Sequence, residues 1–272
     1  MSKCKVIAIA NQKGGVAKTT TAINLGAGLV REGKKVLLID FDAQGDLTAS
    51  LGFNKDNVDI TIKSLLEKTL NQIPINQSEG VLKNAEGIDL IPANIELESL
   101  EMHLTSVINR EYVLTKFINQ VKKDYDYILI DCQPSLGLLT INALASADSV
   151  IIPVQAQYLP IRGMTQLVQT IDKVKAIINP KLKIEGVLLT LADKQTRLAK
   201  ATEETLRSNY GSMLKIFKSV IPVATKVAEA TTEGKSIYAY DKSNKASIAY
   251  ENFIKEVLEN RERLKTRDTQ CR

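Results

Sequence analysis

Short apolar runs alternate with longer amphipathic stretches along most of this chain. The runs are rich in Val, Ile and Leu and are nearly continuous, which is typical of strands buried on both faces of a sheet. Their separation by helical stretches predicts a mostly parallel, twisted sheet flanked by helices on both faces. The predicted strands are Lys5–Ala10, Lys35–Ile39, Ile88–Ile91, Tyr127–Ile130, Val150–Val154 and Ile184–Leu191.

The stretches between these runs carry apolar residues at helical spacing. No Pro-, Gly- or Ser-rich linker divides the chain, so we predict one domain over residues 1–264 and a frayed, charged tail over 265–272. The polar segment 71–87 is predicted to form a surface excursion or a small hairpin. The predicted helices are Lys18–Glu32, Thr61–Leu70, Glu111–Lys122, Leu138–Ala147, Arg162–Ile178, Lys194–Tyr210 and Lys245–Arg263.

A glycine-containing loop joins the first strand to the first helix and reads Asn-Gln-Lys-Gly-Gly-Val-Ala-Lys-Thr-Thr over residues 11–20. Glycines let backbone N–H groups curl around an anion, and the following helix adds its positive end. This context predicts a phosphate-binding loop in which Lys18 reaches the β- and γ-phosphates and Thr19 helps to hold Mg²⁺. Ala17 is tolerable if its φ is negative and costly if the loop needs a positive φ.

Acidic residues close two of the predicted strands. Asp40 and Asp42 follow one apolar run, and Asp131 follows another. An acidic residue at the end of a single strand is usually a turn or helix cap. Two such strand ends after a phosphate loop instead favour a phosphoryl-transfer site, where carboxylates hold Mg²⁺ and position water.

Composition narrows the class of protein. The chain has 272 residues, is 44% hydrophobic and has three separated cysteines and one histidine, His103, so disulfide frameworks and multi-histidine metal sites are excluded. No apolar run approaches a membrane span, and the first residues lead directly into a strand. We therefore expect a cytoplasmic protein.

Charge is unevenly distributed. Residues 1–172 carry 16 Lys and Arg against 19 Asp and Glu, a net of −3, whereas residues 173–272 carry 20 against 12, a net of +8. A basic final third can form a nucleic-acid surface. A merely solvated, lysine-rich face explains the charge equally well.

Three motifs together resemble the ParA/MinD family of ATPases. The phosphate loop resembles the deviant Walker A motif K-G-G-x-G-K-T-T, with Lys13 as its signature lysine and Ala17 in place of its last glycine. The segment 36–45 resembles the Walker A′ motif V-L-L-I-D-x-D-P-Q-G, with Ala43 for proline. The segment 129–137 resembles the Walker B stretch I-I-D-C-P-P-S-L-G, with Gln133 for its first proline. The likeness continues in family order over nearly the whole chain, and is strongest to short Soj-like and small plasmid ParA proteins.

The resemblance implies specific roles. Asp42 polarises the hydrolytic water, Asp40 supports the site, and Lys13 of one subunit touches the phosphates held by the other, so Asp42, Lys13 and Lys18 are the implied catalytic residues. The implied magnesium ligands are Thr19, Asp42 and Asp131. The implied nucleotide contacts are Lys13, Gly14, Gly15, Val16, Ala17, Lys18, Thr19, Thr20 and Pro222.

The same resemblance implies a Mg²⁺-dependent P-loop ATPase that converts ATP to ADP and phosphate in plasmid or chromosome partition. An ATP-dependent homodimer would bind double-stranded DNA without sequence preference, and a ParB-like partner would stimulate hydrolysis. The protein would be nucleoid-associated and would not bind membranes. Its DNA contacts would come from the basic final third, with Arg197 and Lys226 as candidates, beside Lys200 and Lys235.

Two other functions share this fold. A MinD-like positioning ATPase ends in an amphipathic membrane helix, whereas residues 260–272 lack a large apolar face. A metabolic ATP-dependent synthetase, making an amide or a biotin precursor, would need a small-molecule pocket for which the sequence shows no motif.

Overall fold

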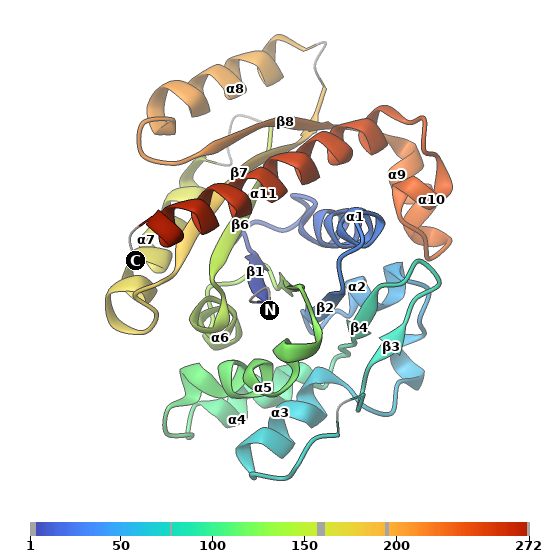
Figure 1. Cartoon of the computed structure of the whole chain (residues 1–272), viewed down its shortest axis with the longest axis vertical. Coiled ribbons are helices and arrows are strands. Elements are labelled where there is room, and N and C mark those ends of the chain that lie inside the picture. The colour runs from blue at the N-terminus through green and yellow to red at the C-terminus, as the bar shows by residue number, and fades with distance from the viewer. Residues whose placement is uncertain (1–3, 77, 157–160, 194–195, 271–272) are drawn as a thin grey trace.

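The computed structural model describes residues 4–76, 78–156, 161–193 and 196–270. Within them, eight strands form one sheet in the order β3-β4-β2-β5-β1-β6-β7-β8 (Figure 1). Every neighbouring pair is parallel except β3 and β4. The strands are β1 (Lys5–Ile9), β2 (Val36–Phe41), β3 (Leu82–Lys83), β4 (Asp89–Ile91), β5 (Tyr127–Cys132), β6 (Ser149–Gln155), β7 (Lys183–Ala192) and β8 (Ile216–Pro222).

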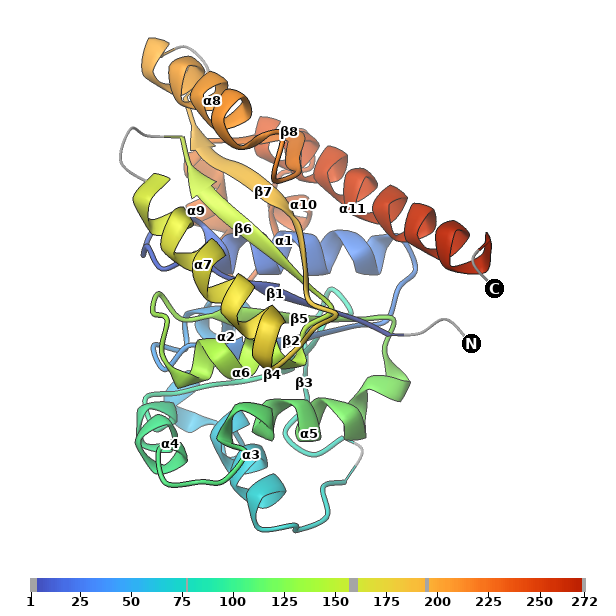
Figure 2. The ribbon, with the colours of Figure 1, turned by 90° about the vertical axis from the view of Figure 1, so that its left-hand side faces the viewer.

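Helices cover both faces of the sheet, as the sequence predicts (Figure 2). The α1 side also carries α2, α10 and α11, and the opposite side carries α3 to α8. The helices are α1 (Lys18–Arg31), α2 (Asp46–Ser50), α3 (Ile62–Leu70), α4 (Leu97–Leu104), α5 (Val113–Val121), α6 (Leu138–Ser146), α7 (Ile161–Ile177), α8 (Arg197–Tyr210), α9 (Thr225–Thr232), α10 (Ile237–Tyr240) and α11 (Lys245–Gln270).

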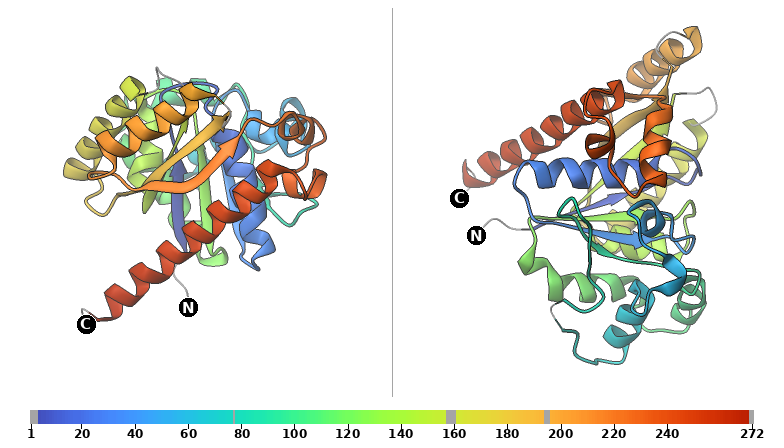
Figure 3. Two further views of the ribbon diagram at one scale, coloured as in Figure 1. Left: turned by 90° about the horizontal axis from the view of Figure 1, so that it is seen from above. Right: turned by 90° about the vertical axis from the view of Figure 1, so that its right-hand side faces the viewer.

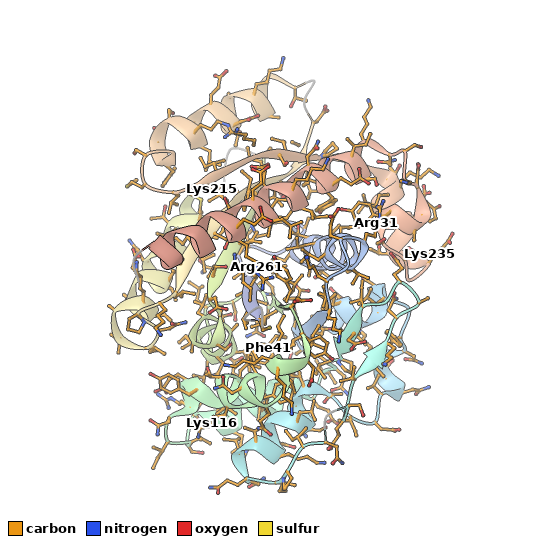
Figure 4. All side chains as sticks on the ribbon, viewed as in Figure 1. Arg31, Phe41, Lys116, Lys215, Lys235 and Arg261 are labelled. Atoms are coloured by element: carbon orange, nitrogen blue, oxygen red, sulfur yellow. The ribbon has the colours of Figure 1, made fainter. Side chains whose placement is uncertain are left out.

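Alternation along β2 explains its continuous apolar run. Successive side chains point to opposite faces of a sheet. Leu37, Ile39 and Phe41 (labelled in Figure 4) therefore join the core under α3 and α5, whereas Val36 and Leu38 join the core under α1. Both faces are buried, so both sets must be apolar. The predicted fold class is confirmed.

All six predicted strands are present, and β3 and β8 are additional. The segment 71–87 contains β3, which pairs antiparallel with β4. The sequence analysis misses β8 because it is an edge strand with an exposed lysine, Lys218, inside its apolar run. The Glu256 carboxylate of α11 accepts backbone N–H bonds from Lys218 at 2.9 Å and Ser219 at 2.8 Å, which covers this part of β8.

The long helix α11 crosses the α1 face and continues beyond the body of the molecule (Figure 3). It extends to Gln270, farther than its predicted end at Arg263. Arg261 fastens it to the amino end of the sheet, because its guanidinium lies 4.3 Å from the centre of the Tyr127 ring. None of the helices in the described part of the chain combines the length and apolar character needed to cross a membrane.

Candidate nucleotide-binding site

The predicted phosphate loop and acidic strand ends meet at one edge of the sheet. β5 lies between β2 and β1, and its Asp131 is in register with Asp40 on one side and Ile9 on the other. By the alternation of side chains, Asp131 and Asp40 project to the same face as Tyr127 and Leu38, which is the face covered by α1. The two carboxylates therefore lie beside the start of α1, where the phosphate loop ends.

Backbone conformation prepares the loop for an anion. Gly14 and Gly15 are exposed, and Gly15 has a φ of +70°, a conformation that glycine adopts without strain. The loop leads directly into α1, whose first N–H groups are free of intrahelical partners. These two features direct backbone N–H groups and the positive end of a helix toward the place where phosphate oxygens can bind.

Two buried polar side chains hold the loop to neighbouring strands. Asn11 donates from Nδ2 to the carbonyl of Pro153 at 2.6 Å and accepts the backbone N–H of Lys13 at 3.0 Å. The Thr190 hydroxyl donates to the carbonyl of Val16 at 3.0 Å. The sequence analysis misses both anchors, although a polar residue at the end of an apolar strand is the signal that each one leaves.

Lys18 bends back over the loop. Its side chain is buried, and its Nζ donates to the carbonyl of Lys13 at 3.2 Å. Burial lowers the pKa of this ammonium, and the negative charges of Asp131 and Asp42 raise it in opposition. The Lys18 amino group is thus held over the phosphate loop, and its predicted contact with the β- and γ-phosphates stays a prediction.

Ala17 occupies a left-handed conformation, with φ +63° and ψ +38°. The loop therefore requires a positive φ at this position, which is the costly case for alanine, and Ala17 is strained. A non-glycine residue in this region costs roughly 1–2 kcal/mol. Part of that cost is recovered because alanine has fewer unfolded conformations than glycine.

Ala17→Gly is therefore expected to raise the free energy of unfolding by about 0.5–1 kcal/mol. Urea denaturation followed by circular dichroism measures the change. Ala228→Gly, in an exposed position of α9, is the matched control and should lower the same quantity by about 1 kcal/mol, because the helix interior disfavours glycine. A loss of stability in Ala17→Gly would contradict the strain.

Asp40 is completely buried and organises the turn into α2. Its Oδ2 accepts the backbone N–H of Thr48 at 2.8 Å and the Thr48 hydroxyl at 2.6 Å. Burial raises the pKa of Asp40 to about 7, and its hydrogen bonds from Thr48 oppose the rise. Asp40 therefore supports the chain around the site through Thr48, and its own carboxylate is closed to solvent.

Asp131 is the residue best suited to hold a cation. It is 1% exposed, and neither of its carboxylate oxygens has a hydrogen-bond partner among the described residues. Burial raises its pKa well above the usual value and Asp40 adds to the rise, whereas the nearby Thr19 side chain and Lys18 oppose it. The Thr19 side chain therefore lies beside this carboxylate.

These groups fit Mg²⁺. Among the residues that the structure describes, no three His, Cys, Asp or Glu side chains gather into a metal site. Mg²⁺ seldom uses such a cage in nucleotide-binding proteins, because it keeps waters and binds one or two carboxylates together with phosphate oxygens. The two unpartnered oxygens of Asp131 beside Thr19 supply such a set.

The remaining predicted site residues lie on the same edge with more exposure. The Lys13 side chain is exposed, and Asp42 is half-buried with its Oδ1 accepting the backbone N–H of Gln44 at 3.0 Å. Pro222 ends β8, which β6 and β7 separate from β1.

Two of the lysines predicted to contact DNA are paired with carboxylates, which reduces the positive charge that they present. Lys226 of α9 is 2.9 Å from the Glu229 carboxylate and 5.4 Å from the Tyr240 ring centre. Lys235, labelled in Figure 4, is 2.8 Å from Glu233. Arg197 begins α8, but its side chain lies outside the described residues.

Comparison with known proteins identifies the family. A family model described as an AAA domain matches residues 4–184. The sporulation initiation inhibitor protein Soj of Bacillus subtilis is 44% identical over 94% of this chain and 99% of its own length. The chain belongs to the Soj/ParA family. The chromosome partitioning protein ParA of Caulobacter vibrioides is 39% identical over 93% of this chain and 94% of its own. The resemblance inferred from the three motifs is confirmed.

Solved structures extend the likeness of this Soj/ParA protein to its fold. A cobyrinic acid a,c-diamide synthase from Mycobacterium smegmatis, with bound ADP and magnesium, is 36% identical with a TM-score of 0.83, covering 95% of this chain and 96% of that one. A plasmid partition protein from Borrelia burgdorferi is 26% identical with a TM-score of 0.73, covering 95% and 99%.

Proposed function

We propose that this Soj/ParA protein is a Mg²⁺-dependent ATPase of DNA partition, with residues 1–264 as its ATPase domain and 265–272 as an appended tail. The observation that carries the proposal is the convergence of Lys18, Thr19 and the unpartnered Asp131 carboxylate at adjacent strand ends. Each group matches one requirement of phosphoryl transfer: a cation for the phosphates, a hydroxyl and a carboxylate for Mg²⁺.

In this proposal each group in the site has a separate role. Loop amides from Gly14 to Thr20 and the start of α1 bind the phosphates, and Lys18 neutralises the β- and γ-oxygens. Thr19 and Asp131 would hold Mg²⁺, which would supply positive charge to neutralise the phosphates when bound, and Asp42 would act through water rather than on the ion directly. Asp42 orients the attacking water at the open side of the site. Pro222 contacts the nucleotide from the end of β8.

Hydrolysis by one copy alone is expected to be slow, because an aspartate is a weak base. A ParB-like partner stimulates it in this proposal, and release of DNA follows. The relatives named as chromosome partitioning proteins support this assignment. The protein then resides on the nucleoid for as long as ATP is bound.

Lys13→Gln is expected to prevent ATP-dependent dimerisation while leaving nucleotide binding in place. The exposed Lys13 ammonium is free to reach phosphates on a second copy, where it would couple dimerisation to the γ-phosphate. Light scattering of Asp42→Ala with ATP should report a dimer, and the double variant with Lys13→Gln should report a monomer. Lys34→Gln, at the opposite edge of the sheet, is the control. A stable dimer in the double variant would refute the role of Lys13.

DNA binding is expected to require ATP, ignore sequence and weaken steeply with salt. Each phosphate contact contributes a slope of about −0.9 in log affinity against log salt, so a dimer with two basic faces binds far better than a monomer. Lys226→Glu should weaken binding uniformly across sequences. Glu229→Gln should strengthen it, because it releases Lys226 from its ion pair.

Biolayer interferometry with ATP, ADP and no nucleotide at two salt concentrations measures this expectation. ATP binding should be nearly unchanged in both variants, which serves as the control. Equal DNA affinity in all three nucleotide states would instead favour a merely solvated basic face.

An amide synthase is the second candidate, because a structural relative at 36% identity carries that name. Such an enzyme would turn over ATP only with a small carboxylic acid and an amine donor, independently of DNA and partner. Turnover measured with each of these additions separates the two functions. A MinD-like role would show as ATP-dependent co-sedimentation with liposomes; the MinD structure from Pyrococcus horikoshii is 24% identical and shares the fold.

A further inference from the structure

The loop between β5 and α6 lies against the phosphate loop. It begins directly after Asp131 and Cys132 and covers residues 133–137. A Cβ placed on Gly14 would lie 4.0 Å from the Cβ of Pro134, so the two loops lie side by side, about one methyl group apart. This loop therefore adjoins both Asp131, at the end of β5, and the phosphate loop.

Hydrogen bonds give this loop a defined shape. The Ser135 Oγ accepts from Gln133 Nε2 at 2.8 Å and from the backbone N–H of Gly137 at 3.3 Å. The Thr140 hydroxyl of α6 donates to the carbonyl of Ser135 at 2.8 Å. Gln133 stands where the family has a proline, so this chain holds the loop with a side-chain amide instead of a ring.

Glu101 of α4 accepts two hydrogen bonds from this loop and the start of α6, and these two bonds are called the Glu101 grip below. Its Oε2 accepts from Gln133 Nε2 at 3.2 Å, and its Oε1 accepts the backbone N–H of Leu139 at 3.2 Å. Leu139 lies in the first turn of α6, where a negative charge also interacts favourably with the helix dipole. Gly137 leaves room for this arrangement, because a Cβ there would lie 2.3 Å from Glu101 Oε1.

We infer that Glu101 is a positioning residue for ATP hydrolysis: by accepting from Gln133 and Leu139, it holds the loop after Asp131 against the phosphate loop. This inference rests on the proposed ATPase function and extends it to a residue on α4. Because the phosphate-binding amides lie on the other loop, losing the grip should lower kcat and leave the KM for ATP nearly unchanged. A displacement near 1 Å at a reacting centre can cost on the order of 100-fold in rate.

A reciprocal exchange tests the grip without changing side-chain size. Gln133→Glu places two carboxylates opposite each other and is expected to lower kcat by about 10-fold or more. Glu101→Gln alone keeps the contact, because the Gln133 amide can turn its oxygen toward the N–H of the amide at 101, so kcat should stay within about threefold of wild type. In the double variant, the amide at 101 donates to the carboxylate at 133 and still accepts from Leu139, so kcat should return to within about twofold of wild type. An unchanged Gln133→Glu variant, or a double variant that stays as slow as Gln133→Glu, would overturn the inference.

Amide hydrogen exchange supplies a readout that needs no nucleotide. In Glu101→Ala the Leu139 amide should exchange at least about 10-fold faster than in wild type, because its acceptor is gone. Gly137→Ala should reproduce this change by displacing the carboxylate, and should add little in the Glu101→Ala background. Glu98→Ala, at an exposed position of the same helix, is the matched control.

The two hypotheses fail in different ways. Absent ATP turnover in the wild type, measured beside Lys18→Ala, would refute the proposed function. Unchanged exchange at Leu139 in Glu101→Ala would refute the grip, whatever the turnover.

Discussion

Lys18→Ala is expected to abolish nucleotide binding. The ammonium is buried over the phosphate loop and directed at its interior by the bond to the Lys13 carbonyl. Each hydrogen bond to a charged group contributes about 1.5–3 kcal/mol, and Lys18 would serve two phosphates, so a loss of about 100-fold or more in ATP affinity follows. Isothermal titration calorimetry with Mg-ATP and Mg-ADP measures it.

Lys35→Ala is the control for the lost charge, because Lys35 is exposed at the opposite edge of the sheet. It should leave both affinities unchanged. Thermal unfolding of Lys18→Ala without nucleotide must show a cooperative transition, which separates lost binding from lost folding. Affinity within threefold of wild type would place the phosphates elsewhere.

Asp42→Ala is expected to retain ATP binding and to lose hydrolysis. Asp42 is half-buried, and in the proposed site Lys18 would bind the phosphates while Thr19 and Asp131 would hold Mg²⁺. Orientation and deprotonation of water by a positioned group contribute about 10²–10⁴ in rate, so partner-stimulated turnover should fall by at least that lower bound. Phosphate release measures turnover, and calorimetry measures binding.

Asp46→Ala removes an exposed carboxylate four residues farther along the chain and should leave turnover unchanged. Wild-type turnover in Asp42→Ala would remove Asp42 from the reaction. A joint loss of binding and turnover would instead assign Asp42 to the direct hold on Mg²⁺.

The meeting of Asp40, Asp131 and the phosphate loop was predictable because parallel strands bring their carboxyl ends to one edge of a sheet. Long apolar runs identified β1, β2 and β5. The phosphate loop and the acidic residues that follow these strands could then be located from the sequence alone. β8 and the short helices α2, α4, α9 and α10 were not predicted. Their apolar residues are few or interrupted, as Lys218 interrupts β8, and contacts with the rest of the molecule stabilise them.

The sequence analysis also missed the groups that hold the site in shape. Asn11, Thr190 and Glu101 each bond to a residue distant in the chain, so the local sequence does not identify their partners. The outcome at Ala17 depended on a backbone angle that alanine rarely adopts. Here the requirements of the loop override the local preference of the residue.

Polymerisation by strand addition is disfavoured at both margins of the sheet. A bare margin of N–H and C=O groups would let copies join side by side into open-ended filaments. At one margin Glu256 already occupies the N–H groups of Lys218 and Ser219, and at the other β3 offers only two residues. Strand addition at either margin would therefore have to displace Glu256 or rest on two residues, so any contact between copies would depend on side chains instead.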